Sequence, residues 1–316
     1  MAELALTSLA AGDASVRRRV SNLLYSRRTL TLFLVLLPPL LWFGVVYIGS
    51  LLMLLSQSLL TFDEMAMSVT PELTLDNFRQ LLQLANFDIV LRTTLMAMAV
   101  TLGSVAIGFP IAYYMAHFAG PREKGFFYVG VRLLMWASYI VKGYAWTVLL
   151  AKGGVIYWVL GKLGLIGVLE ALLRIPGIGG ETLATSNIGR FLVFTYIWLP
   201  FMILPIQAAI ERVPSNLLLA SSDLGARPWT TFRTVLWPLA FPGVVAGSIF
   251  TFSLTLGDYI IPKLVGPSGE FIGSMVYTMQ GTIGNMPLAA AFTCVPIVLI
   301  TVYLGIARRL GAFNAL

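Results

Sequence analysis

The chain has 316 residues, of which 58% are hydrophobic and only 11% are charged, and its mean hydropathy is +0.86. Soluble domains usually carry about 25% charged residues, so this composition excludes an ordinary soluble protein and predicts an integral membrane protein. The net charge of +7 would suit a nucleic-acid-binding protein, but the basic residues are scattered at the ends of apolar segments rather than gathered on one face. The single cysteine, Cys294, excludes an intramolecular disulfide and a thiol metal cluster.

The first 28 residues are polar, and they contain the basic clusters Arg17, Arg18, Arg19 and Arg27, Arg28. A basic region before an apolar run is also typical of a signal peptide. The apolar run at 30–60 is too long for such a peptide and has no A-x-A-like exit, so we predict a retained first membrane span, kinked at Pro38 and Pro39. The polar stretch 61–88 follows, with a short surface helix expected after its cap, Thr74.

Five further apolar segments are long enough to cross a bilayer: about 89–118, 126–150, 191–210, 242–264 and 286–307. The segment 152–188 is rich in glycine and carries charges, so we expect it to be re-entrant or to lie in the membrane interface. With six spans, most basic residues fall on the side that holds residues 1–28, 215–243 and 310–316. The positive-inside rule therefore predicts that both termini are cytoplasmic, and it disfavours seven spans.

Residues 215–243 form a polar stretch between the fourth and fifth spans. Ser215 is expected to cap a short helix, and Gly225 follows it where a positive φ would be needed. Pro228 suits the first turn of a second helix, which we expect to stop before Pro238. From composition alone, this stretch could be a loop that only connects two spans.

The order of residues in this stretch resembles the EAA motif of binding-protein-dependent ABC importer permeases. That motif reads E-A-A, three residues, G, nine residues, then I-x-L-P. Gly225 and Pro238 have the required separation, and Ala220 matches the first alanine. The chain departs from the motif at Leu219 (the acid), Ser221 (the second alanine), Val235 (the isoleucine) and Trp237 (the leucine). We call residues 215–243 the EAA-like loop.

The resemblance covers about residues 30–309. Within the family, the sequence is most similar in its detailed segments to the spermidine/putrescine branch. The segments that carry it include LTLDNF, YIWLPFMILPIQAAIERV and AGSIFTFSLTLGDYIIPKLVG. It implies an all-α integral membrane protein with the type I ABC importer permease fold, in which residues 29–309 form the permease domain of six transmembrane helices. A cytoplasmic coupling helix would lie between the fourth and fifth spans, in a bacterial inner-membrane protein.

The resemblance also implies a division of labour. Such a permease pairs with a second homologous permease, two cytosolic ATP-binding subunits and an extracytoplasmic substrate-binding protein. The sequence contains no G-x-x-x-x-G-K-[ST] loop, so ATP and Mg²⁺ would be bound by the ATPase partners, with no cofactor in this chain. With one histidine, His117, and no paired carboxylates, the sequence predicts neither a metal site nor an enzyme.

The first helix of the EAA-like loop is expected to insert into a groove on the ATPase. The residues expected to make this contact are Leu217, Leu218, Leu219, Ala220, Ser221, Asp223, Gly225, Arg227 and Pro228. The three leucines would be apolar anchors, and Asp223 and Arg227 could pair with charges on the partner. Leu219 in place of the motif's acid removes one polar contact.

Ionisable residues inside spans normally face a partner or water, because a charge at mid-bilayer costs about 2.5–3.5 kcal/mol. The candidates are Arg132, Lys142 and Asp258. Asp258 lies after Gly257 and before Pro262, where a helix can open and expose a carboxylate to a cationic substrate. The alternative is a Lys142–Asp258 ion pair that joins two helices.

Aromatic residues near these charges are Tyr144, Trp146, Tyr196, Trp198 and Tyr259. They could form a cation-binding cage or an interfacial belt. The predicted substrate pathway therefore comprises Asp258, Lys142, Tyr144, Trp146 and Tyr259. The resemblance to the spermidine/putrescine branch implies that the substrate is a polyamine or similar small organic cation. Other solutes of related permeases remain alternatives: amino-acid conjugates, opines, organophosphonates and iron.

A secondary transporter is the competing class of function. Six spans and charges within them would suit it, but no convincing repeat relates the two halves of the sequence. Gly243 and Gly247 form a G-x-x-x-G pattern, for which we expect a role in close helix packing.

Overall fold

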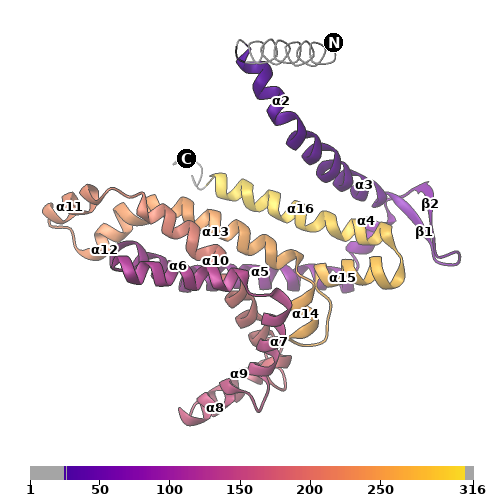
Figure 1. The fold of residues 1–316 in the computed structure, drawn as a ribbon. Coiled ribbons are helices and arrows are strands. Elements are labelled where there is room, and N and C mark those ends of the chain that lie inside the picture. The colour runs from indigo at the N-terminus through magenta and orange to yellow at the C-terminus, as the bar shows by residue number, and fades with distance from the viewer. Residues whose placement is uncertain (1–24, 26, 310–316) are drawn as a thin grey trace, which may run out of the picture. The chain divides into compact units, whose positions relative to one another are not determined.

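The structure is a computed structural model that describes Tyr25 and residues 27–309, which form helices and one two-stranded sheet (Figure 1). Most of the predicted cytoplasmic segment 1–28 and the tail 310–316 lie outside the described residues. The chain divides into two compact units, residues 1–57 and 58–316. Within the described residues, six helices are long and apolar enough to cross a membrane.

The first unit is helical over the predicted first span. It comprises α2 (Arg28–Leu41), a π-helical segment η1 (Trp42–Ile48) and α3 (Gly49–Gln57). Pro38 and Pro39 lie inside α2 and cannot donate to the helical ladder, and the wider π turns begin three residues after Pro39. Within the described part of this unit, η1 and α3 contain no buried side chain, as suits a helix that lies in lipid.

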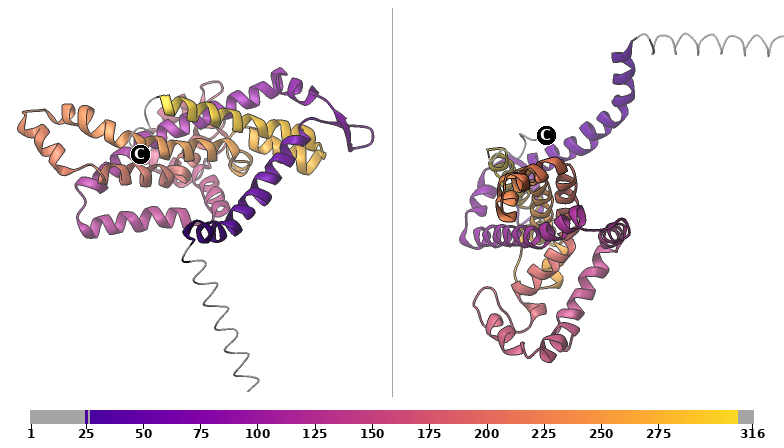
Figure 2. Two further views of the ribbon diagram at one scale, coloured as in Figure 1. Left: turned by 90° about the horizontal axis from the view of Figure 1, so that it is seen from above. Right: turned by 90° about the vertical axis from the view of Figure 1, so that its left-hand side faces the viewer.

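The second unit is organised around α10, which packs against α5 and α13 (Figures 1 and 2). The long helices are α5 (Leu84–His117), α10 (Asn187–Glu211), α13 (Trp237–Gly257) and α16 (Met286–Arg309). They cover most of the segments predicted as the second, fourth, fifth and sixth spans. Buried residues of α5 and α10 contribute to both main core clusters, and buried residues of α13 contribute to the first.

Two glycines of α13 allow it to approach α10 closely. A β-carbon on Gly243 would lie 2.5 Å from that of Ala209, and one on Gly247 would lie 3.0 Å from Cα of Met202. Real β-carbons do not make contacts as short as the one at Gly243, and a β-carbon at Gly247 would have very little room, so both glycines permit the close approach. The predicted packing role of the G-x-x-x-G pattern is therefore confirmed.

The predicted third span at 126–150 is wrong as a single helix. The chain forms α6 (Pro121–Trp136), breaks at Ala137 and Ser138, and continues as α7 (Tyr139–Leu150). At the break, Lys142 donates from Nζ to the Leu134 carbonyl (2.9 Å), one of the acceptors that the end of α6 leaves open. The candidate span in this region is instead Tyr139–Lys162.

The segment 152–188 contains two short helices, α8 (Val155–Lys162) and α9 (Ile166–Leu173), and a 3₁₀ turn, η2 (Leu183–Thr185). Figure 1 shows α7, α8 and α9 leading away from the long helices of this unit. A tight turn at Gly154 joins α7 to α8. The turn needs glycine, because a β-carbon there would lie 2.4 Å from the Leu149 carbonyl oxygen.

A β-hairpin that the sequence analysis missed precedes α5. Its strands β1 (Leu60–Asp63) and β2 (Ser68–Leu73) are antiparallel. The predicted surface helix is α4 (Asp76–Leu81), but its N-cap is Leu75 rather than the predicted Thr74. The Thr74 hydroxyl, one residue before the cap, accepts from the Asp76 amide (3.1 Å). The buried Asn77 side chain ties α4 to the hairpin by donating to the carbonyls of Ser58 (2.9 Å) and Leu60 (2.8 Å).

Short helices lie at both ends of the α10 and α13 pair (Figure 1). At one end are α11 (Ser215–Asp223), α12 (Pro228–Thr231) and the π-helical segment η3 (Phe232–Leu236). At the other end are α14 (Ile260–Leu264), α15 (Ile272–Thr278) and the π-helical segment η4 (Met279–Ile283). These two ends hold the two candidate sites.

Candidate functional site

The first site lies where α13 ends and α14 begins. Asp258 follows Gly257 with an extended backbone (φ −73°, ψ 132°). A continuous helix would need an amide at position 262 to pair with the Asp258 carbonyl, and Pro262 has none. The Asp258 side chain instead accepts from the amides of Ile260 (2.8 Å) and Ile261 (3.1 Å) and begins the new helix. The opening predicted at this position is therefore present.

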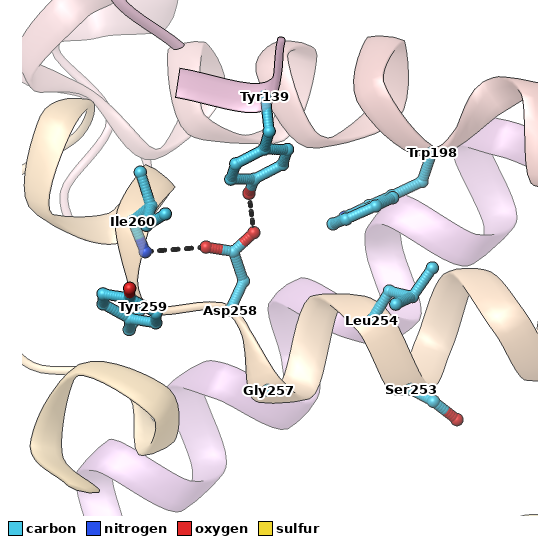
Figure 3. A pocket seen from close by; sticks show the side chains of 8 residues that line it. All are labelled: Tyr139, Trp198, Ser253, Leu254, Gly257, Asp258, Tyr259 and Ile260. Carbon is cyan, nitrogen blue, oxygen red and sulfur yellow. Dashed lines mark hydrogen bonds between the residues drawn. The ribbon is translucent and has the colours of Figure 1, made fainter. Parts of the chain in front are cut away.

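The Asp258 carboxylate is buried in a pocket of about 330 Å³, and only 8% of the residue is exposed. The residues that line this pocket, which we call the Asp258 pocket, are Tyr139, Trp198, Ser253, Leu254, Gly257, Asp258, Tyr259 and Ile260. The Tyr139 hydroxyl donates to the second carboxylate oxygen, and its ring stacks on Trp198 at 5.7 Å between centroids (Figure 3). A buried carboxylate beside aromatic faces is chemically suited to a cation.

The predicted Lys142–Asp258 ion pair is wrong. Lys142 donates to the Leu134 carbonyl, and none of the ion pairs among the described residues includes Asp258. Tyr139, three residues before Lys142 on α7, occupies the position beside the carboxylate. Arg132, the third ionisable candidate, lies on α6 and does not line the pocket.

The other predicted pathway residues are dispersed. Tyr259 lines the Asp258 pocket and stacks on Tyr277 (4.9 Å). Tyr144 is exposed, and Trp146 packs on Tyr196 (5.2 Å) beside a core cluster, so neither lines this pocket. The five aromatic residues therefore do not form one cage.

Tyr139 is the pocket residue that sequence reasoning missed. It lies 119 positions from Asp258 in the chain, and no periodicity relates the two residues. The only local signal is its place at the start of α7, directly after the break at Ala137 and Ser138.

The second site is the EAA-like loop, in which α11 and α12 project from the long helices (Figure 1). Gly225 has φ +76°, as predicted, and the amides of Gly225 and Ala226 donate to the carbonyls of Ser222 (2.9 Å) and Ser221 (3.1 Å). This pair of hydrogen bonds defines a Schellman turn, which ends a helix at a left-handed glycine. The hydroxyls of Ser221 and Thr231 are hydrogen-bonded at 2.8 Å and join α11 to α12.

Two details of the loop differ from prediction. The N-cap of α11 is Pro214 rather than Ser215, because the Pro214 carbonyl accepts the first helical bond, from Leu217 (3.1 Å). Pro228 begins α12 as expected, but helical structure continues through η3 and past Pro238 into α13. The wider π turns directly before Pro238 relieve the clash with the preceding turn that would otherwise end the helix.

The residues predicted to contact an ATPase are accessible. No residue of α11 is buried, and apolar side chains exposed on the loop include Leu217 (45%), Leu219 (61%), Leu224 (87%) and Trp229 (69%). Leu218 is half-buried, while Ala220, Asp223, Arg227 and Pro228 are exposed. Exposed apolar side chains on a short helix are typical of a surface that a partner covers.

The base of the loop is anchored to the helices below it. Val213 before α11 and Leu236 after α12 are both buried in the same core cluster. Glu211, the last residue of α10, forms an ion pair with Lys124 on α6 and accepts from Gln207 (3.2 Å). The hydrogen bond with Glu211 raises the pKa of Lys124 above its ordinary value. The base of the loop is therefore in contact with the core that α6 and α10 help to form.

The chain is similar to known transport proteins. Residues 108–312 match the family described as "Binding-protein-dependent transport system inner membrane component". The chain is 63% identical to the inner membrane ABC transporter permease protein YdcU of Escherichia coli (strain K12), over 94% of this chain and 95% of that protein. It is 28% identical to the spermidine/putrescine transport system permease protein PotB of the same organism, over 76% of this chain and 83% of that protein.

Among solved structures, a chain of a bacterial ABC transporter involved in the import of alginate has the same fold. The TM-score is 0.67 at 17% sequence identity, and the match covers 92% of this chain and 99% of that chain. The comparisons confirm the predicted fold and resemblance. The protein is a multi-pass inner membrane protein and a transport component rather than a catalytic enzyme. Permeases of this kind work with ATPase and binding-protein partners. The chain belongs to the family of binding-protein-dependent transport system inner membrane components, and it is a permease subunit of an ABC transporter.

Proposed function

We propose that the chain forms half of the translocation pathway of an ATP-driven importer, and that its substrate is a polyamine or similar small organic cation. The observation that carries the substrate class is the carboxylate of Asp258. It is buried beside the aromatic rings of Tyr139, Trp198 and Tyr259, and it belongs to none of the ion pairs among the described residues. The similarity to PotB points to the same class of substrate.

The chemistry of the pocket matches the parts of a diamine. An ammonium group can pair with the carboxylate, which offsets the cost of a buried negative charge. The aromatic faces attract the same cation, and the apolar side chains of Leu254 and Ile260 suit the methylene groups between two amines. An anionic solute would meet only repulsion from Asp258.

Energy for transport would come from partner subunits. We infer that α11 docks in a groove on a cytosolic ATPase, with the exposed Leu217 and Leu219 as its apolar anchors. A complete transporter would contain this chain, a second homologous permease, two ATPase subunits that bind ATP and Mg²⁺, and an extracytoplasmic binding protein that delivers the substrate. Both termini and the EAA-like loop would then lie in the cytoplasm.

Replacement of Asp258 by asparagine tests the proposed substrate class. The variant is assembled with its own partner subunits and binding protein in proteoliposomes, and ATP-driven uptake of radiolabelled putrescine is measured against concentration. Loss of one charge-assisted contact should raise the Michaelis constant about tenfold. The control is Glu64→Gln, which removes an exposed acid on the hairpin and should leave the constant unchanged. An unchanged constant in Asp258→Asn would refute the pathway role.

A further inference from the structure

Arg190, in the first turn of α10, is a fully buried cation without an acidic partner among the described residues. None of its surface is exposed. The ion pairs of this part of the chain join Arg79 to Asp76, Arg92 to Asp88 and Lys124 to Glu211. A buried charge is costly unless its donors find acceptors, so the partners of Arg190 indicate what the residue is for.

The guanidinium donates to three backbone carbonyls of one short segment: Nε to Val265 (2.8 Å), and Nη2 to Pro262 (3.2 Å) and Pro267 (3.0 Å). Nη1 donates to Oδ1 of Asn187 on the same helix (3.0 Å), and the Phe271 ring lies 4.4 Å from the guanidinium carbon. The donors of Arg190 are thus used mainly to hold the carboxyl end of α14 and the turn that follows it.

That turn closes tightly around the guanidinium. Gly266 has φ +104°, and a β-carbon there would lie 2.5 Å from the guanidinium carbon of Arg190. The amide of Gly266 donates to the Ala184 carbonyl (2.8 Å), which fixes the turn from its other side. Only glycine combines this backbone conformation with so close an approach.

α14 has five residues, and a helix of this length is not stable by itself. The Asp258 carboxylate holds its amino end through the amides of Ile260 and Ile261, and Arg190 holds its carboxyl end. A negative group at the amino end and a positive group at the carboxyl end both match the helix dipole. Because α14 is so short and depends on both anchors, release of its carboxyl end would disturb the backbone at its amino end, where Asp258 lies.

We propose that Arg190 is a positioning residue for the Asp258 pocket. By fixing the carboxyl end of α14, it sets where the Asp258 carboxylate lies and so how well the pocket holds a cation. Arg190 does not line the pocket and acts only through α14. The transport part of this inference rests on the proposed function of Asp258.

A double-mutant cycle tests the connection. Arg190→Gln, Asp258→Asn and the double variant are compared in the assembled transporter by putrescine uptake, normalised to the amount of complex. We expect Arg190→Gln to raise the Michaelis constant about tenfold and the double variant to be no worse than Asp258→Asn, because both changes remove the same positioned carboxylate. If Arg190→Gln lowers only the amount of complex, or if the two effects multiply, the inference is wrong.

Further variants separate geometry from charge and from failure to assemble. Arg190→Lys keeps the charge but cannot reach three carbonyls with one planar fork, so the Michaelis constant should stay raised. Full rescue by lysine would overturn the positioning role. Gly266→Ala keeps both Arg190 and Asp258 and should also raise the Michaelis constant. If Arg190→Gln does not assemble, this variant still tests the positioning role. Gly164→Ala, at φ +68° in open space, is the matched control.

Labelling of Asp258 distinguishes this inference from the proposed function. The rate at which dicyclohexylcarbodiimide modifies the Asp258 carboxyl, followed by mass spectrometry, reports its surroundings without any substrate. We expect the rate to change in Arg190→Gln and Gly266→Ala but not in Gly164→Ala. If the rate changes while Asp258→Asn transports normally, positioning stands and the proposed function fails. If Asp258→Asn is impaired while the Arg190 variants change neither labelling nor uptake, the proposed function stands and positioning fails.

Discussion

Gly225 offers a way to disable the EAA-like loop while the rest of the chain stays folded. Its φ is +76°, and no atom of a neighbouring group lies within 4 Å of the place where its β-carbon would be. Gly225→Glu would therefore create no clash inside the chain and would cost only the left-handed strain, about 1–2 kcal/mol. This strain falls on an exposed turn whose first helix, α11, contains no buried residue. We expect the variant to insert and unfold normally but to lose transport.

Gly164 provides a matched control for the backbone strain. Its φ is +68°, its β-carbon position is also open, and it lies in the segment 152–188. Gly164→Glu carries the same strain and adds the same charge, so any defect specific to Gly225→Glu must arise at the surface of the EAA-like loop. The assay is ATP-driven putrescine uptake in membrane vesicles, normalised to permease content, together with the amount of ATPase that copurifies.

A third variant separates strain from bulk. Asparagine tolerates the left-handed conformation better than other residues with a β-carbon, so Gly225→Asn should retain most of the transport. The coupling role of the loop would be refuted by intact uptake in Gly225→Glu. It would also be refuted if Gly164→Glu lost transport to the same extent.

Three further predictions concern packing, coupling and the hairpin. Gly243→Val should destabilise the solubilised protein by about 1–3 kcal/mol in a thermal unfolding assay, because its β-carbon would lie 2.5 Å from the β-carbon of Ala209 on α10. The control is Gly130→Ala, in open space on α6, which should be neutral or stabilising in the same assay. Lys124→Glu and Glu211→Lys should each raise ATP hydrolysis relative to uptake, and the double charge swap should restore the ratio if the ion pair transmits movement of the loop. A swap that restores nothing would exclude that role for the pair. Asn77→Ala should remove two hydrogen bonds and lower amide-exchange protection of residues 60–73 by about 1–3 kcal/mol, and unchanged protection would contradict the anchoring role.

The long helices could be predicted from the sequence because their signal is local. An apolar run of about 20 residues must be helical in lipid, where each backbone group needs an internal partner. The third predicted span failed because hydropathy does not detect the break at Ala137 and Ser138, where the backbone is extended and Lys142 donates to the Leu134 carbonyl. The hairpin was missed because its two strands have four and six residues and no regular alternation of burial.

Local backbone chemistry predicted part of each candidate site. Gly225 and Pro228 occupy the places that turn and helix-start rules give them, and the helix opens at Asp258 as the Gly-Asp-Tyr-Ile-Ile-Pro order suggested. The partner of Asp258 could not be predicted, because charge alone favoured Lys142 and only the packing of α7 against α14 brings Tyr139 there.

The helical run that continues past Pro238 joins the two ends of the molecule mechanically. From Pro228 to Gly257 it has 30 residues, which at about 1.5 Å per residue corresponds to a helical path of about 45 Å. One end of this run belongs to the EAA-like loop, and the other ends at the residue before Asp258. The loop and the pocket are therefore joined by one continuous helical backbone. No relay of side chains is needed to connect the two places, because they are the two ends of the same helical run.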